Sequence, residues 1–199
     1  LCHPHRAPAL SDILPAHQRR KGFVLILVAF STQALVAAAI LVHMVPMLSA
    51  LGLAGSAAFI GAIFGPSQVA SRLINMLGGK NLAPISLAVI SASLMGLALI
   101  VLLFGAPSII ATMMFACLFG FGNGLFSIVS GTLPLSLFGS DGYGAMQGKI
   151  MSARLIISAT APFAMAFGIA NFGASWSLTI LAVSAALGVS TLTGLKFLH

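Results

Sequence analysis

The sequence predicts an all-α membrane protein with six transmembrane helices. Hydrophobic residues make up 59% of the chain and charged residues only 6%, whereas a soluble domain has about 25% charged residues. The hydrophobic residues fall into six runs, each close to the roughly 20 residues that cross a hydrocarbon core. The Lys and Arg residues gather on one side of the membrane that these runs define. Together the three observations exclude a soluble globular domain.

The six predicted spans follow one another with short connections. In chain order they cover residues 23–45, 54–77, 84–104, 109–129, 149–169 and 175–196. Residues 131–138 prolong the fourth run, so we expect an interfacial piece there, followed by a loop over 139–144. Residues 1–21 contain three prolines and four basic residues, which predicts a polar cytoplasmic linker ahead of a six-helix domain over 22–199.

The distribution of basic residues predicts the orientation of the spans. Connections near residues 46–53, 105–107 and 171–174 contain no charged residue, while all nine Lys and Arg lie at or near the other side. Cytoplasmic loops are enriched in Lys and Arg, so both termini are expected in the cytoplasm. The formal charge of +7 follows from this enrichment, and no nucleic-acid partner is expected.

The second predicted span carries a stripe of small and polar residues at helical spacing. Its members recur three or four residues apart: Gly61, Gly65, Gln68, Arg72 and Asn75. An arginine within a span costs roughly 2.5–3.5 kcal/mol on insertion scales, so Arg72 is expected to face protein or a water-filled cavity. We expect the two glycines to let a neighbouring helix approach closely. The alternative is that Arg72 extends to the lipid headgroups and ends the helix.

Polar residues are distributed unevenly among the spans. The third and sixth carry only Ser and Thr, which predicts peripheral helices facing lipid. The other four carry amides, arginines or stripes of small residues, which predicts the walls of a shared polar interior. Two lining spans followed by a peripheral one, repeated twice, suit two three-helix inverted repeats. The stripes on the fourth and fifth spans are Ala116, Gly120, Asn123, Ser127, Gly131 and Gln147, Met151, Arg154, Ser158, Pro162.

Six residues are the candidate lining of a transport pathway. The arginines at its inner mouth can attract an anion, and amides hydrogen-bond a polar solute as donor or acceptor. Alternatively, Gln33 and Asn123 form hydrogen bonds between helices. The six residues are Gln33, Gln68, Arg72, Asn123, Ser127 and Arg154.

Enzyme chemistry is not expected, because it needs convergent acids, a metal-ligand cluster or an activated nucleophile. Both acidic residues, Asp12 and Asp141, lie outside the predicted spans. The Cys2-His3-Pro4-His5 cluster has no matching second cluster, so neither a metal nor another cofactor is expected.

The segment 71–80 resembles the loop motif of the major facilitator superfamily, Gly-x-Leu-x-Asp-Arg-x-Gly-Arg-Lys. It keeps Leu73, Gly78 and Lys80, and it has Ser, Asn and Gly at positions 71, 75 and 79. These replacements put a charge-relay gating role of the loop in doubt. Segments 131–139 and 161–163 also look like bacterial members of the family. The resemblance covers residues 22–196 and fits the C-terminal six-helix half of such a transporter.

This resemblance implies a twelve-helix permease in the bacterial cytoplasmic membrane that moves a small solute by alternating access, as efflux or uptake. Residues 1–21 would then be its central loop, and the chain would be a fragment lacking the N-terminal six-helix half. Two alternatives remain open at this stage: a polytopic membrane scaffold without transport, and a half-size transporter that works as a homodimer.

Overall fold

The computed structural model describes residues 14–79 and 82–197, and in these ranges the chain is helical with short connections and no strand. The elements are α1 (Arg19–Leu48), the short π-helical segment η2 (Ser49–Leu53), α2 (Ala57–Gly78), α3 (Pro84–Gly105), α4 (Ile109–Phe138), α5 (Tyr143–Phe172) and α6 (Ala174–Lys196). Six of these helices are long and apolar enough to cross a membrane. The predicted all-α membrane protein with six spans is therefore confirmed at this level.

The fourth and fifth helices are longer than the sequence analysis predicted. Residues 131–138 continue α4 without a break, and their place at the membrane interface stays a prediction. The α5 helix begins at Tyr143, which shortens the predicted loop to residues 139–142. The glycines at 139 and 142 have φ angles of 78° and 68°, a region that glycine enters without steric cost. They turn the chain within four residues, so the flanking residues remain helical.

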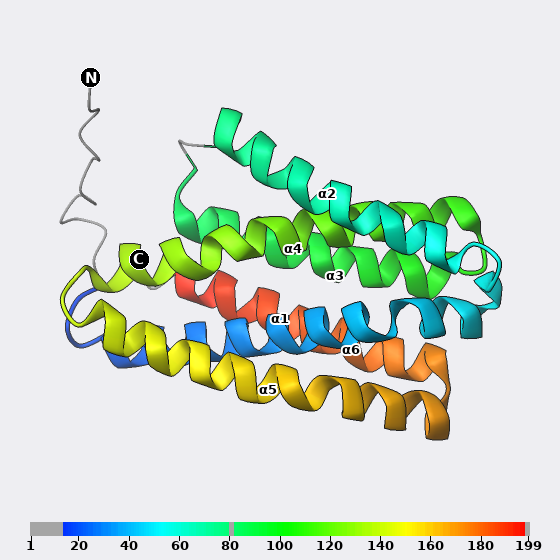
Figure 1. The fold of residues 1–199 in the computed structure, drawn as a ribbon. Coiled ribbons are helices and arrows are strands. Elements are labelled where there is room, and N and C mark those ends of the chain that lie inside the picture. The colour runs from blue at the N-terminus through cyan, green and yellow to red at the C-terminus, as the bar shows by residue number, and fades with distance from the viewer. Residues whose placement is uncertain (1–13, 80–81, 198–199) are drawn as a thin grey trace.

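The helices form two layers of three, each built around a central helix (Figure 1). In one layer α4 packs between α2 and α3, and in the other α1 packs between α5 and α6. The layers meet mainly through α3 and α6. The central helices α1 and α4 also meet edge to face at Phe30 and Phe126, with ring centroids 5.3 Å apart.

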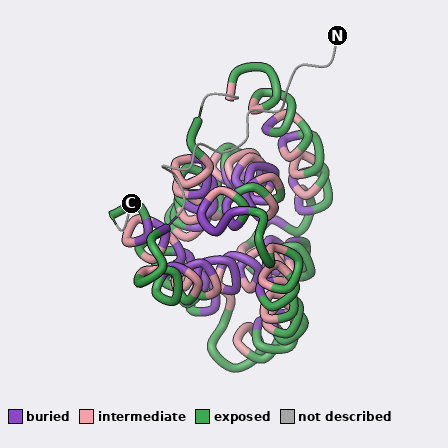
Figure 2. Tube along the Cα trace, turned by 90° about the vertical axis from the view of Figure 1, so that its left-hand side faces the viewer, coloured by how far each residue is buried: buried purple, intermediate pink, exposed green. Residues whose placement is uncertain are grey.

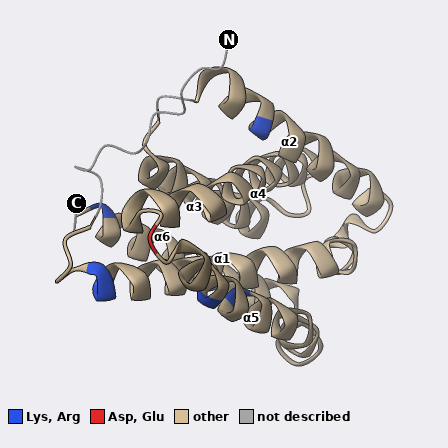
Figure 3. Cartoon of the chain, turned by 60° about the vertical axis from the view of Figure 1, so that its left-hand side comes forward, with Lys and Arg blue, Asp and Glu red and all other residues tan. Residues whose placement is uncertain are grey.

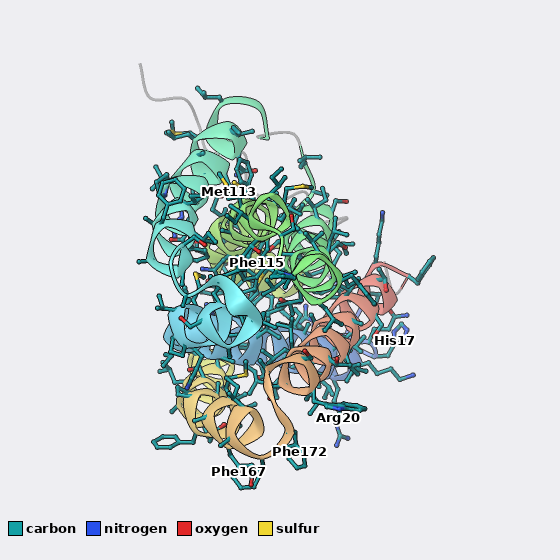
Figure 4. All side chains as sticks on the ribbon, turned by 90° about the vertical axis from the view of Figure 1, so that its right-hand side faces the viewer. His17, Arg20, Met113, Phe115, Phe167 and Phe172 are labelled. Atoms are coloured by element: carbon teal, nitrogen blue, oxygen red, sulfur yellow. The ribbon has the colours of Figure 1, made fainter. Side chains whose placement is uncertain are left out.

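Two apolar clusters fill the bundle, one toward each end. The cluster nearer the termini includes Phe30 on α1 and Phe126 on α4, and the other includes Val36 and Phe119 on the same helices. Between them lie smaller or polar residues, such as Gln33 and the segment 120–124 on α4. Figure 2 shows buried residues where the layers meet, while α2 and α5 expose much of their surface. In Figure 4, Phe115 lies inside the bundle, whereas Phe167 and Phe172 point outward.

Both ends of the described chain lie at the same end of the bundle, because the six helices alternate in direction (Figure 1). The described basic residues lie in the parts of the helices nearest this end, and Figure 3 shows where they lie in the fold. Connections at the opposite end, residues 49–56, 106–108 and 173, carry no charged residue. The charge asymmetry of the sequence is therefore an asymmetry of the folded bundle.

Candidate functional site

Arg154 lies where three helices from both layers converge. It is a half-buried residue of α5, on the side that also carries the buried residues Ile150 and Ala161. Its guanidinium carbon is 4.9 Å from the ring centroid of Phe126 on α4 and 5.9 Å from that of Phe30 on α1. A cation over an aromatic face within about 6 Å is attracted by the ring quadrupole. The two rings therefore hold the arginine against the crossing of the central helices.

Arg154 lies well inside its helix. Measured from Tyr143, where α5 begins, it is about three turns in, at about 3.6 residues per turn. The α5 helix starts six residues before the predicted span, which began at residue 149. A side chain at this depth does not simply extend to the near headgroups, since it lies over aromatic rings instead.

The Arg154 guanidinium has no carboxylate partner among the described residues. One of its terminal nitrogens, Nη1, is 3.4 Å from Sδ of Met151, and its buried Nε has no hydrogen-bond partner there. Asp141, the acidic residue within the described ranges, is exposed at the α4–α5 turn. Asp12 lies outside the described residues. A partly buried cation without a counter-ion is a chemically competent site for an anionic group.

Two hydrogen bonds join the beginning of α5 to the end of α4. The Tyr143 hydroxyl donates to the carbonyl oxygen of Gly131 at 2.9 Å, and Nε2 of Gln147 donates to that of Ser130 at 3.0 Å. The stripe predicted on the fifth span thus contributes Gln147 as an interhelical donor. These bonds lie on the same side of α5 as Arg154 and fix its approach to α4.

A seam of small residues joins α4 to α2. A Cβ atom added at Gly120 would lie 2.7 Å from the carbonyl oxygen of Phe64 and 2.8 Å from Cβ of Ser67. At Gly124 the added atom would collide with Oγ of Ser71. The close approach predicted for Gly65 is wrong for the described chain, because nothing lies within 4 Å of a Cβ there, and Gly61 makes only an ordinary contact with another helix. The small residues that permit close approach belong mainly to α4.

The predicted polar stripe of α2 lies beside this seam. At about 100° per residue, Gln68 and Arg72 are offset by one residue from the buried Ser67 and Ser71. A Cβ at Gly61, on the same stripe, would lie 3.6 Å from Sδ of Met44 on α1. The stripe therefore turns toward the other layer, with Gln68 half-buried and Arg72 exposed.

Asn123 and Ser127 lie on the corresponding side of α4. They are one turn apart, Asn123 half-buried and Ser127 exposed, and the Ser127 hydroxyl donates to the Gly124 carbonyl at 2.6 Å. The opposite side of α4 contributes Phe121 and Leu125 to a separate apolar hollow of about 380 Å³ between α2 and α3. Asn123 and Ser127 therefore share the side of α4 on which Arg154 lies over Phe126.

Gln33 lies on the side of α1 that faces α6. Its side chain is fully buried, and neither its amide nitrogen nor its amide oxygen has a hydrogen-bond partner among the described residues. A Cβ added at Gly188 of α6 would lie 2.8 Å from the Gln33 Nε2. Gln33 thus packs into the α1–α6 contact.

Three residues of this region carried no signal in the sequence analysis. Phe30 and Phe126 looked like ordinary apolar residues of a span, and only the fold brings their rings to Arg154. Ser91 lies on α3, which was expected to face lipid, yet its buried hydroxyl donates to the Gly122 carbonyl at 2.8 Å. The run of glycines at 120, 122 and 124 was the available signal for such close backbone contacts.

Metal binding finds no support in the described residues, which contain no group of three or more His, Cys, Asp and Glu that could hold an ion. The Cys2, His3 and His5 cluster lies outside the described residues. The predicted site residues supply two guanidinium groups, amides and a hydroxyl, and Arg154 lies over two aromatic rings.

Comparison with known proteins identifies no relative of this chain. It matches no family model, no curated protein and no solved structure. Conclusions about its function consequently rest on residue chemistry and helix packing.

Proposed function

We propose that this chain is the C-terminal six-helix half of a major facilitator-type permease that moves a small solute by alternating access. One observation carries the proposal. The main contacts between long helices keep a counterpart when α1 is exchanged with α4, α2 with α5 and α3 with α6, with the α5–α6 contact as the exception. Thus α2 packs on α4 as α5 packs on α1, and α3 packs on α4 as α6 packs on α1. Two inverted three-helix repeats, as in each half of such a transporter, predict this exchange.

The proposed path follows the inner face, which we define as the polar side chains that α2, α4 and α5 turn toward the space between the layers. Gln68, Asn123 and Ser127 can exchange hydrogen bonds with a polar solute. Arg154, held against two aromatic rings, attracts an anionic group of the solute. Arg72 is the remaining residue of the inner face beside Arg154. Gln33 joins the path if α6 moves away from α1 during the transport cycle.

A second six-helix unit is part of the proposal. The helices α5 and α2 are the least buried of the six, and they carry polar residues on faces that no other described helix covers. Unsatisfied polar groups in hydrocarbon cost several kcal/mol each. An N-terminal half would cover these faces, and a second copy of the chain is the alternative. A scaffold without transport would have no need for polar residues on these faces.

The basic end of the bundle gives the proposed orientation, with both termini in the cytoplasm of a bacterial cell. Single cysteines at Gly52, Ala106 and Gly173, in a background without Cys2 and Cys117, should react with an impermeant thiol reagent added outside. If a cysteine at Gly142 were labelled from outside instead, the orientation would be the opposite of the one proposed.

Water access to the inner face tests the path without knowledge of the solute. Cysteines at Gln68, Asn123 and Ser127 should react with a small cationic thiol reagent in membranes. Cysteines at Leu97 and Ile100, which are exposed apolar positions of α3, are matched controls in lipid and should not react. Equal reactivity at the two sets would contradict a water-lined path.

Flux tests the function itself. The chain, alone and together with a candidate six-helix partner, is reconstituted in liposomes and assayed with a panel of labelled organic anions, cations and neutral solutes. We expect flux only when the partner is present, and we expect it to be fastest for an organic anion. Robust flux by the chain alone would support the homodimer, and no flux of any solute with any partner would contradict transport.

A further inference from the structure

We propose that the end of the bundle that holds both termini binds an anionic phospholipid, in a hollow between the start of α1 and the α4–α5 turn. The hollow has a volume of about 410 Å³. Cations and apolar side chains line it together: Arg19, Arg20 and Lys149, with Phe23, Phe138 and Met146. We call it the Lys149 hollow. The proposal does not depend on transport, only on the membrane location of the helices.

The charges of the Lys149 hollow favour an anion. Its three cations are exposed and face one carboxylate, that of Asp141, which lines the same hollow. Arg19 donates from Nε to the Leu14 carbonyl oxygen at 3.3 Å, a bond that leaves its positive charge unneutralised. The side chain of Arg20 points away from the helices (Figure 4). An excess of exposed positive charge therefore remains at the rim.

The apolar residues of the hollow favour a lipid over a free phosphate. Phe138 is buried, and Phe23 and Met146 are half-buried, so they form a floor that the first methylene groups of an acyl chain can cover. The hollow lies at the helix ends of a membrane-spanning bundle, at the level where headgroups are found. Basic pockets between helices on the cytoplasmic side are known to suit anionic headgroups.

The neighbouring surface extends the same chemistry. Arg20 also lines a second hollow of about 440 Å³ between α1 and α6, together with Lys21, Val24 and Leu25. Arg20 thus lies between two hollows that each combine cations with apolar side chains. This arrangement suits a row of anionic lipids around the first turns of α1, with the Lys149 hollow as the site that has an aromatic floor.

The test measures lipid binding to the purified full chain by native mass spectrometry, with phosphatidylglycerol and phosphatidylcholine of equal chain length as probes. We expect phosphatidylglycerol to bind in preference. A cation near the membrane surface is worth about 1 kcal/mol, so Lys149→Gln should weaken phosphatidylglycerol binding about fivefold. Lys196→Gln, which removes one exposed cation at the same end of the bundle, is the matched control and should retain binding. Asp141→Asn should strengthen it.

Each other outcome counts against the proposal. Equal losses in Lys149→Gln and Lys196→Gln would show attraction to overall charge, without a site. Displacement of the lipid by millimolar inorganic phosphate would show that the apolar floor contributes nothing. Equal binding of the two lipids by the unmodified chain would exclude recognition of an anionic headgroup. Weaker phosphatidylglycerol binding by the Asp141→Asn variant would show that the headgroup binds away from this hollow.

Discussion

The two layers of the bundle use one arrangement of helices with different residues at their centres. The α2–α4–α3 layer is built on α4, whose glycines at 120, 122 and 124 bring the backbones of both neighbours into close contact. The α5–α1–α6 layer is built on α1, which has no glycine between residues 23 and 51. At comparable depth α1 carries Phe30 and Gln33 instead.

This difference changes how each central helix contacts its neighbours. Around α4 the glycine contacts are accompanied by a buried hydrogen bond from Ser91 to Gly122. Around α1 the amide of Gln33 has no partner among the described residues. Hollows remain in both layers, about 100 Å³ among Leu35, Ala39 and residues of α5 and α6 and about 380 Å³ between α2 and α3, so they do not distinguish the layers. Close-packed backbones have few alternative arrangements, whereas incomplete packing tolerates movement. We therefore expect the α4 layer to act as the rigid part and the α1 layer to contain the moving contacts.

The largest expected effect is the loss of stability caused by adding a methyl group in the α2–α4 seam. Gly120→Ala and Gly124→Ala should each lower stability by about 1–3 kcal/mol, because the new Cβ meets backbone atoms that cannot move aside. Thermal unfolding of the purified chain in detergent measures the change.

Gly65→Ala is the control for the seam, since nothing lies within 4 Å of its added Cβ. It should leave stability unchanged or raise it by up to about 0.5–1 kcal/mol, because alanine is the better residue in a helix interior. A destabilisation at Gly65 equal to that at Gly120 would mean that α2 packs through the stripe predicted from sequence.

The next largest effect is expected at Arg154, where a substitution should change transport much more than stability. Arg154→Met should abolish flux of an anionic solute while stability changes by no more than about 1–2 kcal/mol, the range of a cation–π contact. Arg154→Lys should also impair transport, because a lysine lacks the planar two-pronged geometry. Unfolding in detergent and flux in liposomes are measured on the same preparations.

Arg72 provides the comparison for Arg154, because it is exposed and lacks an aromatic partner among the described residues. We expect Arg72→Lys and Gln68→Ala to reduce transport less than Arg154→Lys, with no loss of stability. If the Arg154→Met variant had wild-type flux, Arg154 would not belong to the proposed site and its role would be structural.

Hydropathy and charge in the sequence were enough to predict the helices, because the bilayer requires long apolar spans whatever their packing. Helical spacing also showed which residues of α2 share a face. Spacing could not show which face of α2 meets a neighbouring helix. The contact with α4 is made by Ser67 and Ser71, each one residue before a member of the predicted stripe. The position of Arg154 over Phe126 was equally hidden, because contacts between distant helices depend on the assembled fold.

The smallest expected effect is at Gln33, the unpaired amide of the α1 layer. Gln33→Leu should keep the fold and raise stability by about 1 kcal/mol, because an apolar side chain of similar size removes the cost of burying polar groups without partners. If Gln33 serves the path when α6 separates from α1, flux should fall at the same time. Higher stability with unchanged flux would exclude Gln33 from the path. Lower stability would show that the amide is satisfied in the membrane by water or by a partner unit, and that the α1 layer is less loosely packed than its contacts indicate.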